Sequence, residues 1–282
     1  MTGTTLLIGG TGKTGLPLAH LLQNANLPFL VATRHPKNVP ALFKGVAFDW
    51  FDASTFENPF KADPSIDRVY LVGPTAYDML AIMKPFIDLA ISKGVKRFVL
   101  LSSTPTAKGA PFAGKVHEYL ADLGVDYAVL RPTWFIENFG TYFLPGIVRE
   151  DVIISSAKDG RVPFVSSYDI ADVAYKALTD EKSHNTEHII VGPDLYSCDE
   201  VAALLSDVLG RKITHKRLSD EEGKAFFASF ILSKEFVDGM VATHSSAAQG
   251  SEEACFRGEV KDVGKRHLLD YFKENRDLWV SK

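Results

Sequence analysis

The sequence predicts a doubly wound α/β fold, in which helices cover both faces of a parallel β-sheet. Short apolar runs alternate with helical patterns along the first half of the 282-residue chain. These runs are apolar throughout instead of alternating with polar residues, which is typical of strands buried on both faces. Right-handed crossovers between such strands give the doubly wound arrangement.

The elements of the first half are expected in strand–helix order. Strands are predicted at residues 5–8, 28–34, 46–51, 68–72, 97–101 and 127–130. Helices are predicted from residue 16 onward, at 79–91 and at 113–123. Gly94 and Gly124 follow the last two helices, where glycine commonly ends a helix in the left-handed conformation.

Beyond residue 140 the pattern becomes looser, with strands expected at 152–154 and 187–191 and helices near 171–178, 199–209 and 220–230. We therefore predict two domains, a larger one over residues 1–150 and a smaller C-terminal α/β lobe over 151–282, with the chain free to cross back between them. The smaller lobe is expected to close over the ends of the strands, where doubly wound folds bind ligands.

Composition excludes several classes of protein. The chain is 46% hydrophobic and 23% charged, and its net charge of −4 with no basic stripe argues against nucleic-acid binding. Two cysteines, Cys198 and Cys255, are too few for a disulfide framework. No apolar run reaches the ~18–20 residues that span a bilayer, and no signal peptide is expected. We expect a soluble, cytoplasmic protein.

A glycine-rich loop follows the first predicted strand and opens a helix. Residues 9–15 read GGTGKTG, which satisfies GxGxxG in the context that dinucleotide binding requires. Glycines let the backbone approach a pyrophosphate, and the helix N-terminus attracts it. A tight turn without a ligand is the alternative. A P-loop is disfavoured because Leu7 stands where that motif needs glycine. The predicted contacts are Gly9, Thr11, Gly12, Lys13, Thr14 and Gly15.

The end of the second strand points to NADP(H). NAD-binding chains usually place a carboxylate there for the ribose 2′-hydroxyl, whereas this chain has Thr33-Arg34-His35. Arg34 offers a planar donor fork for a 2′-phosphate; a solvated surface arginine is the alternative. Asp49 and Asp52, after the third strand, suit either an adenine contact or a loop cap. Gly73, Pro74 and Ser102, at the ends of the fourth and fifth strands, complete the predicted contacts in this Rossmann-type domain.

Several segments together resemble the NmrA-like atypical short-chain dehydrogenases. They are GGTGKTG, ATRHP, RFVLLSS, GKVHEYL, VLRPTWFIENF and GRVPFVSSYDIADVAYKAL. The pairing of GKVHEYL with LRPTWFIENF is most similar to the fungal ergot-alkaloid reductases of the festuclavine and agroclavine dehydrogenase type. The resemblance covers most of the chain and is weakest after about residue 215. It implies a Rossmann fold, NADP as cofactor and a small alkaloid-like substrate of secondary metabolism.

The resemblance also implies roles for the segment after the sixth strand. In the family this segment lies beside the nicotinamide, so Pro132, Thr133 and Phe135 are expected to contact the cofactor. Trp134 and Phe139 are then expected to flank a flat, cationic substrate through their ring faces. Tyr77 and Asn138 complete the predicted substrate contacts. The alternative is that these aromatic residues are core. The repeat of Phe226, Phe227 and Phe230 is interpreted as lobe core.

The acid usual in this superfamily is missing. Tyrosine-dependent short-chain reductases carry YxxxK on the helix after the fifth strand, where the tyrosine protonates the developing alkoxide. Lys115 matches the lysine and is our predicted catalytic and cofactor-binding residue, but Pro111 stands in the place of the tyrosine. A plain surface lysine is the alternative. His117, Glu118, Tyr119, Tyr142 and Tyr168 are further candidates for a proton donor.

Three functions remain open. The first is an NADPH-dependent reductase of a cyclic iminium, because hydride addition to C=N⁺ yields a neutral amine without an oxyanion to stabilise. The second is an NADP(H)-dependent cyclase that captures an iminium. The third is a non-catalytic NADP sensor that binds a regulatory protein. The aromatic run TWFIENF favours an enzyme. No metal is expected, because His184 and His188 lack a third ligand. The oligomeric state is open.

Overall fold

A computed structural model describes residues 3–231 and 233–280, and the chain divides into two compact units. The first unit extends to Arg131 and includes Ile170–His188. The second unit comprises Pro132–Asp169 and the chain from Ile189 onward. The chain therefore enters the second unit, returns to the first and leaves it again. The sequence analysis placed the boundary between the domains at residue 150. In the structure, residues 132–150 lie in the second unit and residues 170–188 lie in the first.

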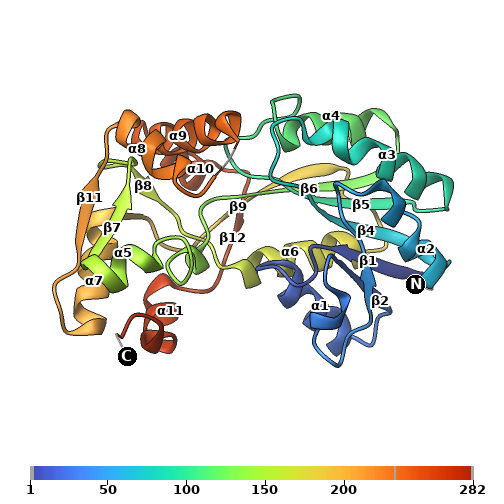
Figure 1. Ribbon diagram of the computed structural model, residues 1–282, viewed down its shortest axis with the longest axis horizontal. Helices are drawn as coiled ribbons and strands as arrows, with labels where there is room; N and C mark the ends of the chain where they lie inside the picture. Colours follow the sequence, from blue (N-terminus) through green and yellow to red (C-terminus); the bar gives the residue numbers. More distant parts are fainter. Residues whose placement is uncertain (1–2, 232, 281–282) are drawn as a thin grey trace. The chain divides into compact units, whose positions relative to one another are not determined.

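The first unit is built on a parallel sheet. Its strands are β1 (Thr4–Ile8), β2 (Phe29–Thr33), β3 (Gly45–Ala47), β4 (Ile66–Val72), β5 (Arg97–Leu101) and β6 (Asp126–Pro132). They lie in the order β3-β2-β1-β4-β5-β6, and each neighbouring pair is parallel (Figure 1). This is the order of dinucleotide-binding doubly wound sheets. The predicted fold class is confirmed.

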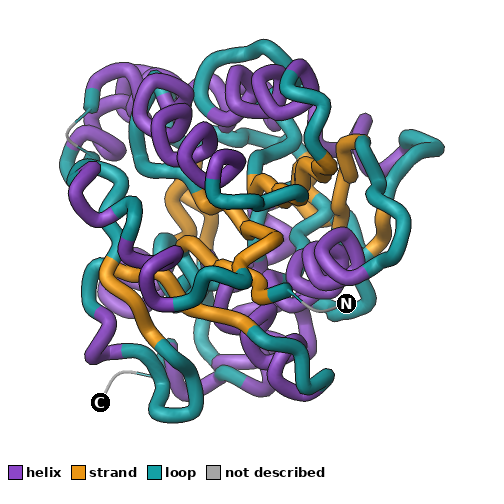
Figure 2. The backbone as a smooth tube through the Cα atoms, turned by 90° about the vertical axis from the view of Figure 1, so that its right-hand side faces the viewer, coloured by secondary structure: helices purple, strands orange, loops and turns teal. Residues whose placement is uncertain are grey.

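Helices cover both faces of this sheet. Helices α3 (Met79–Ser92) and α4 (Ala113–Asp122) lie on one face, and α1 (Gly15–Asn24) and α6 (Ser167–Thr179) lie on the other (Figure 1). Figure 2 shows the same layering, with helices on both sides of the strands. A short helix, α2 (Asn58–Ala62), and the single turns η1 (Pro36–Asn38) and η2 (Ala53–Thr55) complete the unit.

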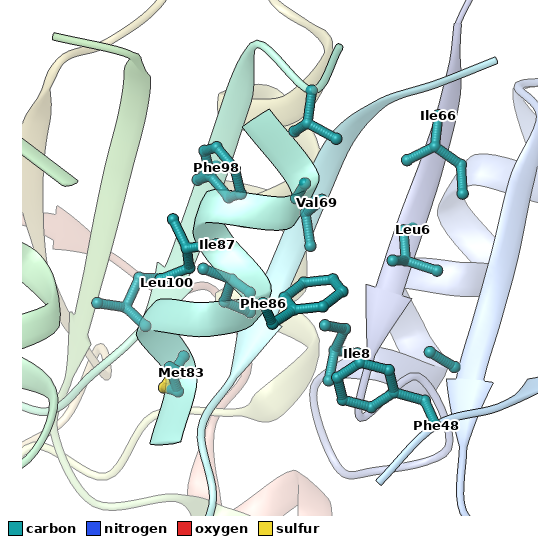
Figure 3. Close-up of a cluster of buried hydrophobic side chains, with 14 of the residues drawn as sticks. Leu6, Ile8, Phe48, Ile66, Val69, Met83, Phe86, Ile87, Phe98 and Leu100 are labelled. Atoms are coloured by element: carbon teal, nitrogen blue, oxygen red, sulfur yellow. The ribbon is translucent and has the colours of Figure 1, made fainter. Parts of the chain in front are cut away.

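The core between the sheet and α3 is apolar and fully buried (Figure 3). Leu6, Val69 and Phe98 come from three strands, and Phe86 and Ile87 face them from α3. Each buried side chain of this size stabilises the fold by roughly 1.5–3 kcal/mol. The apolar character of the strands on both faces therefore reflects burial beneath two helical layers.

A buried arginine ties the returning segment 170–188 to the sheet. Arg97, at the start of β5, donates hydrogen bonds to the carbonyls of Leu178 (3.3 Å) and Asp180 (2.6 Å), at and just beyond the end of α6. A cation at this position satisfies carbonyls that the helix leaves unpaired and complements its dipole. Farther along, the Tyr127 amide donates to Asn185 Oδ1 at 3.0 Å. These contacts explain why the segment packs with the first unit.

The third strand is shorter than predicted. It ends at Ala47 instead of continuing to Phe51. Asp49 Oδ1 accepts from the Phe51 amide (3.0 Å), and Asp52 Oδ1 accepts from the Ser54 amide (3.0 Å). These bonds are the loop caps that the sequence allowed for both aspartates. They turn the chain away from the sheet, so the prediction of a strand through Phe51 is wrong.

The second unit contains short strands and six helices within the described ranges. Strand β7 (Val152–Ser155) pairs in parallel with β11 (Thr214–Arg217), and β8 (Arg161–Val162) pairs antiparallel with β10 (Tyr196–Ser197). Strand β12 (Asp262–Val263) pairs with Ile190 and Val191 of β9 (Thr186–Val191). The helices are α5 (Leu144–Glu150), α7 (Cys198–Leu209), α8 (Asp220–Ala228), α9 (Lys234–Ala248), α10 (Ser251–Arg257) and α11 (Leu268–Glu274). Single turns η3 (Ile136–Asn138) and η4 (Arg276–Leu278) complete it. Within residues 3–231 and 233–280, no helix has the length and apolarity needed to cross a membrane.

His244 is a buried polar residue in the core of the second unit. Its ring lies 4.4 Å from the Trp134 ring and 5.1 Å from the Phe227 ring, measured between centroids. Its Nδ1 accepts a hydrogen bond from the Ser156 amide at 3.4 Å. Burial disfavours the charged imidazolium and lowers the pKa of His244 from 6.5 to about 3.

This burial predicts acid destabilisation. The unfolded chain protonates His244 near its ordinary pKa, whereas the folded chain resists protonation, so the free energy of unfolding should fall as pH drops below that value. One such proton contributes a slope approaching about 1.4 kcal/mol per pH unit. In urea titrations between pH 7 and 5, the free energy of unfolding should fall less for His244→Phe than for the unaltered chain. The exposed His35→Phe serves as control, and equal losses for His244→Phe and the unaltered chain would contradict the prediction.

Candidate functional site

A cleft of about 460 Å³ lies at the carboxyl ends of the central strands of the first unit. It is the place where doubly wound folds bind ligands, because the chain leaves β1 and β4 in opposite directions there. The lining comes from the ends of β1 to β4 and the turns after them. It comprises Ile8, Gly9, Thr11, Gly12, Ala32, Thr33, Arg34, Phe48, Asp49, Trp50, Phe51, Val72, Gly73, Pro74 and Thr75.

The glycines of the loop permit contacts that no side chain would allow. A Cβ on Gly15 would lie 2.3 Å from the Gly9 carbonyl oxygen and 2.6 Å from the Gly10 Cα. Gly9 itself adopts a φ of +75°, which favours glycine. A Cβ on Gly12 would meet only the Gly9 oxygen, at 3.1 Å, so the rest of its surface is open to a ligand. The loop is thus a tight turn that leaves its backbone accessible at the cleft.

The N-terminus of α1 retains its positive character. No acidic residue occurs in its first turn, and no side chain caps it. Thr14, which precedes the helix, instead accepts a hydrogen bond from the buried Tyr70 hydroxyl at 2.9 Å. Burial raises the pKa of Tyr70, so this hydroxyl stays protonated and donates. The bond ties the loop to β4, and the helix dipole stays available to an anion.

Arg34 and Thr33, both predicted to contact the cofactor, line the cleft at the end of β2. The Thr33 hydroxyl accepts from the His35 amide at 3.3 Å, which shapes the turn. The Arg34 side chain is exposed, and no hydrogen bond or ion pair to another described residue fixes it. A guanidinium without a protein partner can receive a phosphate in a bidentate manner. Among the residues lining the cleft, the only other charged side chain is Asp49, whose Oδ1 caps its own turn.

Aromatic residues after β3 form a wall of the cleft that the sequence analysis missed. Trp50 lines it, and the indole Nε1 donates to the Val72 carbonyl at 2.9 Å. Phe51 is 71% exposed at the same cleft. Such rings suit stacking against a planar base. The turn-forming aspartates on both sides were the available signal, but the β-forming aromatic residues between them suggested a strand.

The loop after β5 is held by Arg131. This residue donates to the Ser103 carbonyl at 3.4 Å and to the Thr104 carbonyl, and its Nη1 bonds Glu187 at 2.6 Å. The Ser102 hydroxyl is buried and has no hydrogen-bond partner among the described residues. An unsatisfied hydroxyl at a strand end is the kind of group that a bound ligand can satisfy.

Lys115 lies on α4 and is exposed. Just before this helix, Phe112 adopts a φ of +63°, an unfavourable conformation for a residue with a side chain. The Phe112 amide donates to the Tyr77 carbonyl at 3.2 Å, and the two rings pack edge to face at 5.3 Å. Tyr77, which is 45% exposed, thus lies at the start of the helix that carries Lys115.

The other candidate proton donors differ in their surroundings, and Tyr142 among them has a buried hydroxyl with no hydrogen-bond partner in the described part of the chain. The Tyr119 hydroxyl bonds Asp88 and receives a bond from Lys84 at 2.8 Å. Tyr168 stacks beneath Arg266 at 5.3 Å. His117 is buried on α4, 3.7 Å from Glu187, and desolvation lowers its pKa, so it is neutral. Glu118 is exposed on the same helix.

The segment after the sixth strand lies in the second unit. Pro132 and Thr133 are buried, and the Thr133 hydroxyl donates to the Pro163 carbonyl at 2.5 Å. Phe135 forms a β-bridge with Val165, and Asn138 ends the turn η3. The predicted cofactor contacts of Pro132, Thr133 and Phe135 and the substrate contact of Asn138 stay predictions.

The two predicted substrate aromatics differ in their surroundings. Phe139 is fully buried and packs against Phe143 at 4.9 Å, so its ring belongs to the core of the second unit. Trp134 is only partly buried and packs against His244, and its Nε1 has no partner among the described residues. Phe139 therefore fits the alternative that these aromatic residues belong to the core. Trp134 has an indole Nε1 without a partner among the described residues.

The repeat of Phe226, Phe227 and Phe230, which begins on α8 and ends in the turn after it, is only partly core. Phe227 is 1% exposed, as that interpretation predicts, but Phe226 is half-buried and Phe230 is 53% exposed.

Within residues 3–231 and 233–280, no group of three or more metal-ligating side chains occurs. His184 Nδ1 and His188 Nε2 lie 2.9 Å apart and form a hydrogen bond with each other.

Comparisons with known proteins agree with this architecture. The model of the NmrA-like family matches residues 1–244. Agroclavine dehydrogenase from Claviceps fusiformis is 40% identical over 289 residues, 99% of both chains. Festuclavine synthase I from Penicillium roqueforti is 38% identical over 291 residues, 98% of this chain and all of that protein.

Solved structures share the fold. An NADPH-dependent quinone oxidoreductase from Escherichia coli, complexed with NADPH, has a TM-score of 0.76 at 20% identity, covering 96% of this chain and 99% of the other. Triphenylmethane reductase from Citrobacter sp., complexed with NADP(H), has a TM-score of 0.72 at 20% identity, with the same coverage.

The close contact at Gly15 predicts a severe effect of one methyl group. Gly15→Ala must push the helix away from the Gly9 carbonyl, which should cost about 1–3 kcal/mol of stability. It should also weaken dinucleotide binding, measured by calorimetric titration. Gly258→Ala is the matched control, because its Cβ would have only ordinary contacts at 3.4 Å or more. Similar effects of the two changes would show that the turn tolerates a side chain.

Proposed function

Because the chain belongs to the NmrA-like family, we propose that it is an NADPH-dependent reductase that acts on a cyclic iminium of an indole-alkaloid type. The observation that carries this proposal is the combination of a cleft suited to NADP(H) with Pro111 in place of the catalytic tyrosine. The family relatives named for agroclavine and festuclavine support the substrate class.

The residues of the cleft fit the cofactor. The turn from Gly9 to Gly12 and the N-terminus of α1 would receive the pyrophosphate, because their backbone is open and no carboxylate neutralises the helix dipole. Arg34 would pair with the 2′-phosphate, and the Trp50 and Phe51 rings would lie against the adenine. The unsatisfied Ser102 hydroxyl and the exposed Lys115 would contact the nicotinamide half. When bound, NADPH supplies a hydride.

The missing tyrosine limits the substrates that can react. A carbonyl that accepts a hydride becomes an alkoxide and needs a proton, which the tyrosine normally supplies. An iminium that accepts a hydride becomes a neutral amine and needs none. The chain's own contribution is then to hold the cofactor and the substrate close together and correctly oriented. Proximity and orientation would supply most of the rate enhancement.

Arg34→Asp tests the cofactor assignment. The change replaces a phosphate partner by a repelling charge, so the Kd for NADPH should rise by about 10-fold to 100-fold. The Kd for NADH, which lacks the 2′-phosphate, should change far less. Calorimetric titration measures both, and Lys37→Asp controls for the loss of a nearby exposed positive charge outside the cleft. Equal losses for the two cofactors would refute the role of Arg34.

Turnover of a fixed-charge substrate tests the reaction. The protein, NADPH and an N-methylated cyclic iminium should give a loss of reduced-cofactor absorbance that matches the mass of the reduced amine. Because no acid takes part, the rate at saturation should be nearly constant between about pH 6 and 8. Ring-closed product without loss of NADPH would indicate a cyclase. Tight NADP(H) binding without turnover of any iminium would indicate a sensor, and both outcomes would reject the reductase.

A further inference from the structure

The second unit contains a cavity that the cofactor assignment does not use. Its volume is about 420 Å³, within the range of small-molecule sites. It is enclosed by the approach to α5 and that helix, by Ile154 of β7, and by the end of α8 with the turn after it. It has no lining residue in common with the cofactor cleft.

Aromatic rings form one wall of this cavity. Tyr142, Phe226 and Phe230 all line it, and their planes are steeply inclined to one another. The centroids of Phe226 and Phe230 lie 5.4 Å apart, and that of Tyr142 lies 5.9 Å from Phe230. Phe230, in the turn after α8, keeps 53% of its surface exposed, although Phe227 near the end of that helix is buried. A flat apolar ligand would cover ring surface that otherwise contacts water.

Two charges of opposite sign complete the lining. Arg149 and Glu150 are consecutive residues at the end of α5, and both are exposed. Among residues 3–231 and 233–280, neither side chain forms an ion pair or hydrogen bond within the protein. Asp151, the next residue, pairs with Arg211 at 2.6 Å, so partners are available nearby. The cavity therefore presents one cation and one anion, each able to pair with a ligand.

We propose that this cavity binds a flat aromatic ligand that carries both a carboxylate and an ammonium group, as an aromatic amino acid does. The ring packs against Tyr142, Phe226 and Phe230. The carboxylate pairs with the Arg149 guanidinium, whose planar fork matches it, and the ammonium pairs with Glu150. A purely cationic ligand leaves Arg149 unpaired, and a purely anionic one leaves Glu150 unpaired. The site goes beyond the proposed reductase activity and does not depend on it.

A charge series on one ring tests the proposal. Calorimetric titrations of the full-length protein would compare L-tryptophan, tryptamine and indole-3-propionate, which share an indole and differ in charge. L-Tryptophan should bind up to about fivefold more tightly than either analogue, because each exposed ion pair is worth up to about 1 kcal/mol. Absence of tryptophan binding up to about 10 mM, or equal binding of all three, would overturn the proposal.

Single substitutions then locate the site. Arg149→Ala should weaken the binding of L-tryptophan and of indole-3-propionate and leave the binding of tryptamine unchanged. Glu150→Gln should weaken the binding of L-tryptophan and of tryptamine only. Phe230→Ala should weaken all three by removing part of the wall. Glu259→Gln, an exposed carboxylate outside the cavity, is the control for charge loss. Circular dichroism checks that each variant is folded. Tryptophan binding that none of the three substitutions changes would place the ligand elsewhere and reject this site.

Discussion

The close contact between Gly15 and the Gly9–Gly10 peptide fixes the position of the N-terminus of α1 at the cleft of the first unit. With the Gly15 backbone packed directly on that peptide, α1 starts after the tight turn 9–14 that follows β1. The positive end of the helix therefore lies at the edge of the sheet where the order reverses between β1 and β4. The Tyr70–Thr14 hydrogen bond adds a second constraint from β4. A side chain at Gly15 would separate helix from strand and displace the open backbone of Gly12 with them.

A comparable constraint comes from two arginines that hold pieces of chain remote in sequence. Arg97 occupies the carbonyl end of α6 and so fixes the segment that returns from the second unit. Arg131 joins Glu187, in that returning segment, to the Ser103 and Thr104 carbonyls after β5. The returning segment thus helps to position the loop that carries the unsatisfied Ser102 hydroxyl. This is a physical reason for the chain to cross between the units.

Much of this arrangement could be predicted from the sequence, because buried parallel strands and a glycine turn have strong local signatures. Strand β5 and the cleft residues Thr33 and Arg34 are examples. The failures have local causes. Trp50 and Phe51 favour a strand by type, but the aspartates on both sides close a turn. Helix α9 went unpredicted because its buried face is only Val237, Val241, His244 and Ala247, although Ser233 caps it. The periodicity of Phe226 and Phe230 could not distinguish a core from a cavity wall, since both use the same residues.

The start of α4 links backbone conformation to chemistry. Phe112 is held at a φ of +63° by its bond to Tyr77, at a cost of about 1–3 kcal/mol that the surrounding contacts must offset. The chain retains a lysine on this helix but places a proline, which offers neither a hydroxyl nor an N–H, where the phenol would stand. Under the proposed function, the lysine has no phenol to assist and would serve only to hold the ribose of the cofactor. Under the proposed function, selectivity against carbonyl substrates then follows without any residue that excludes them, because their alkoxides would have no proton to receive.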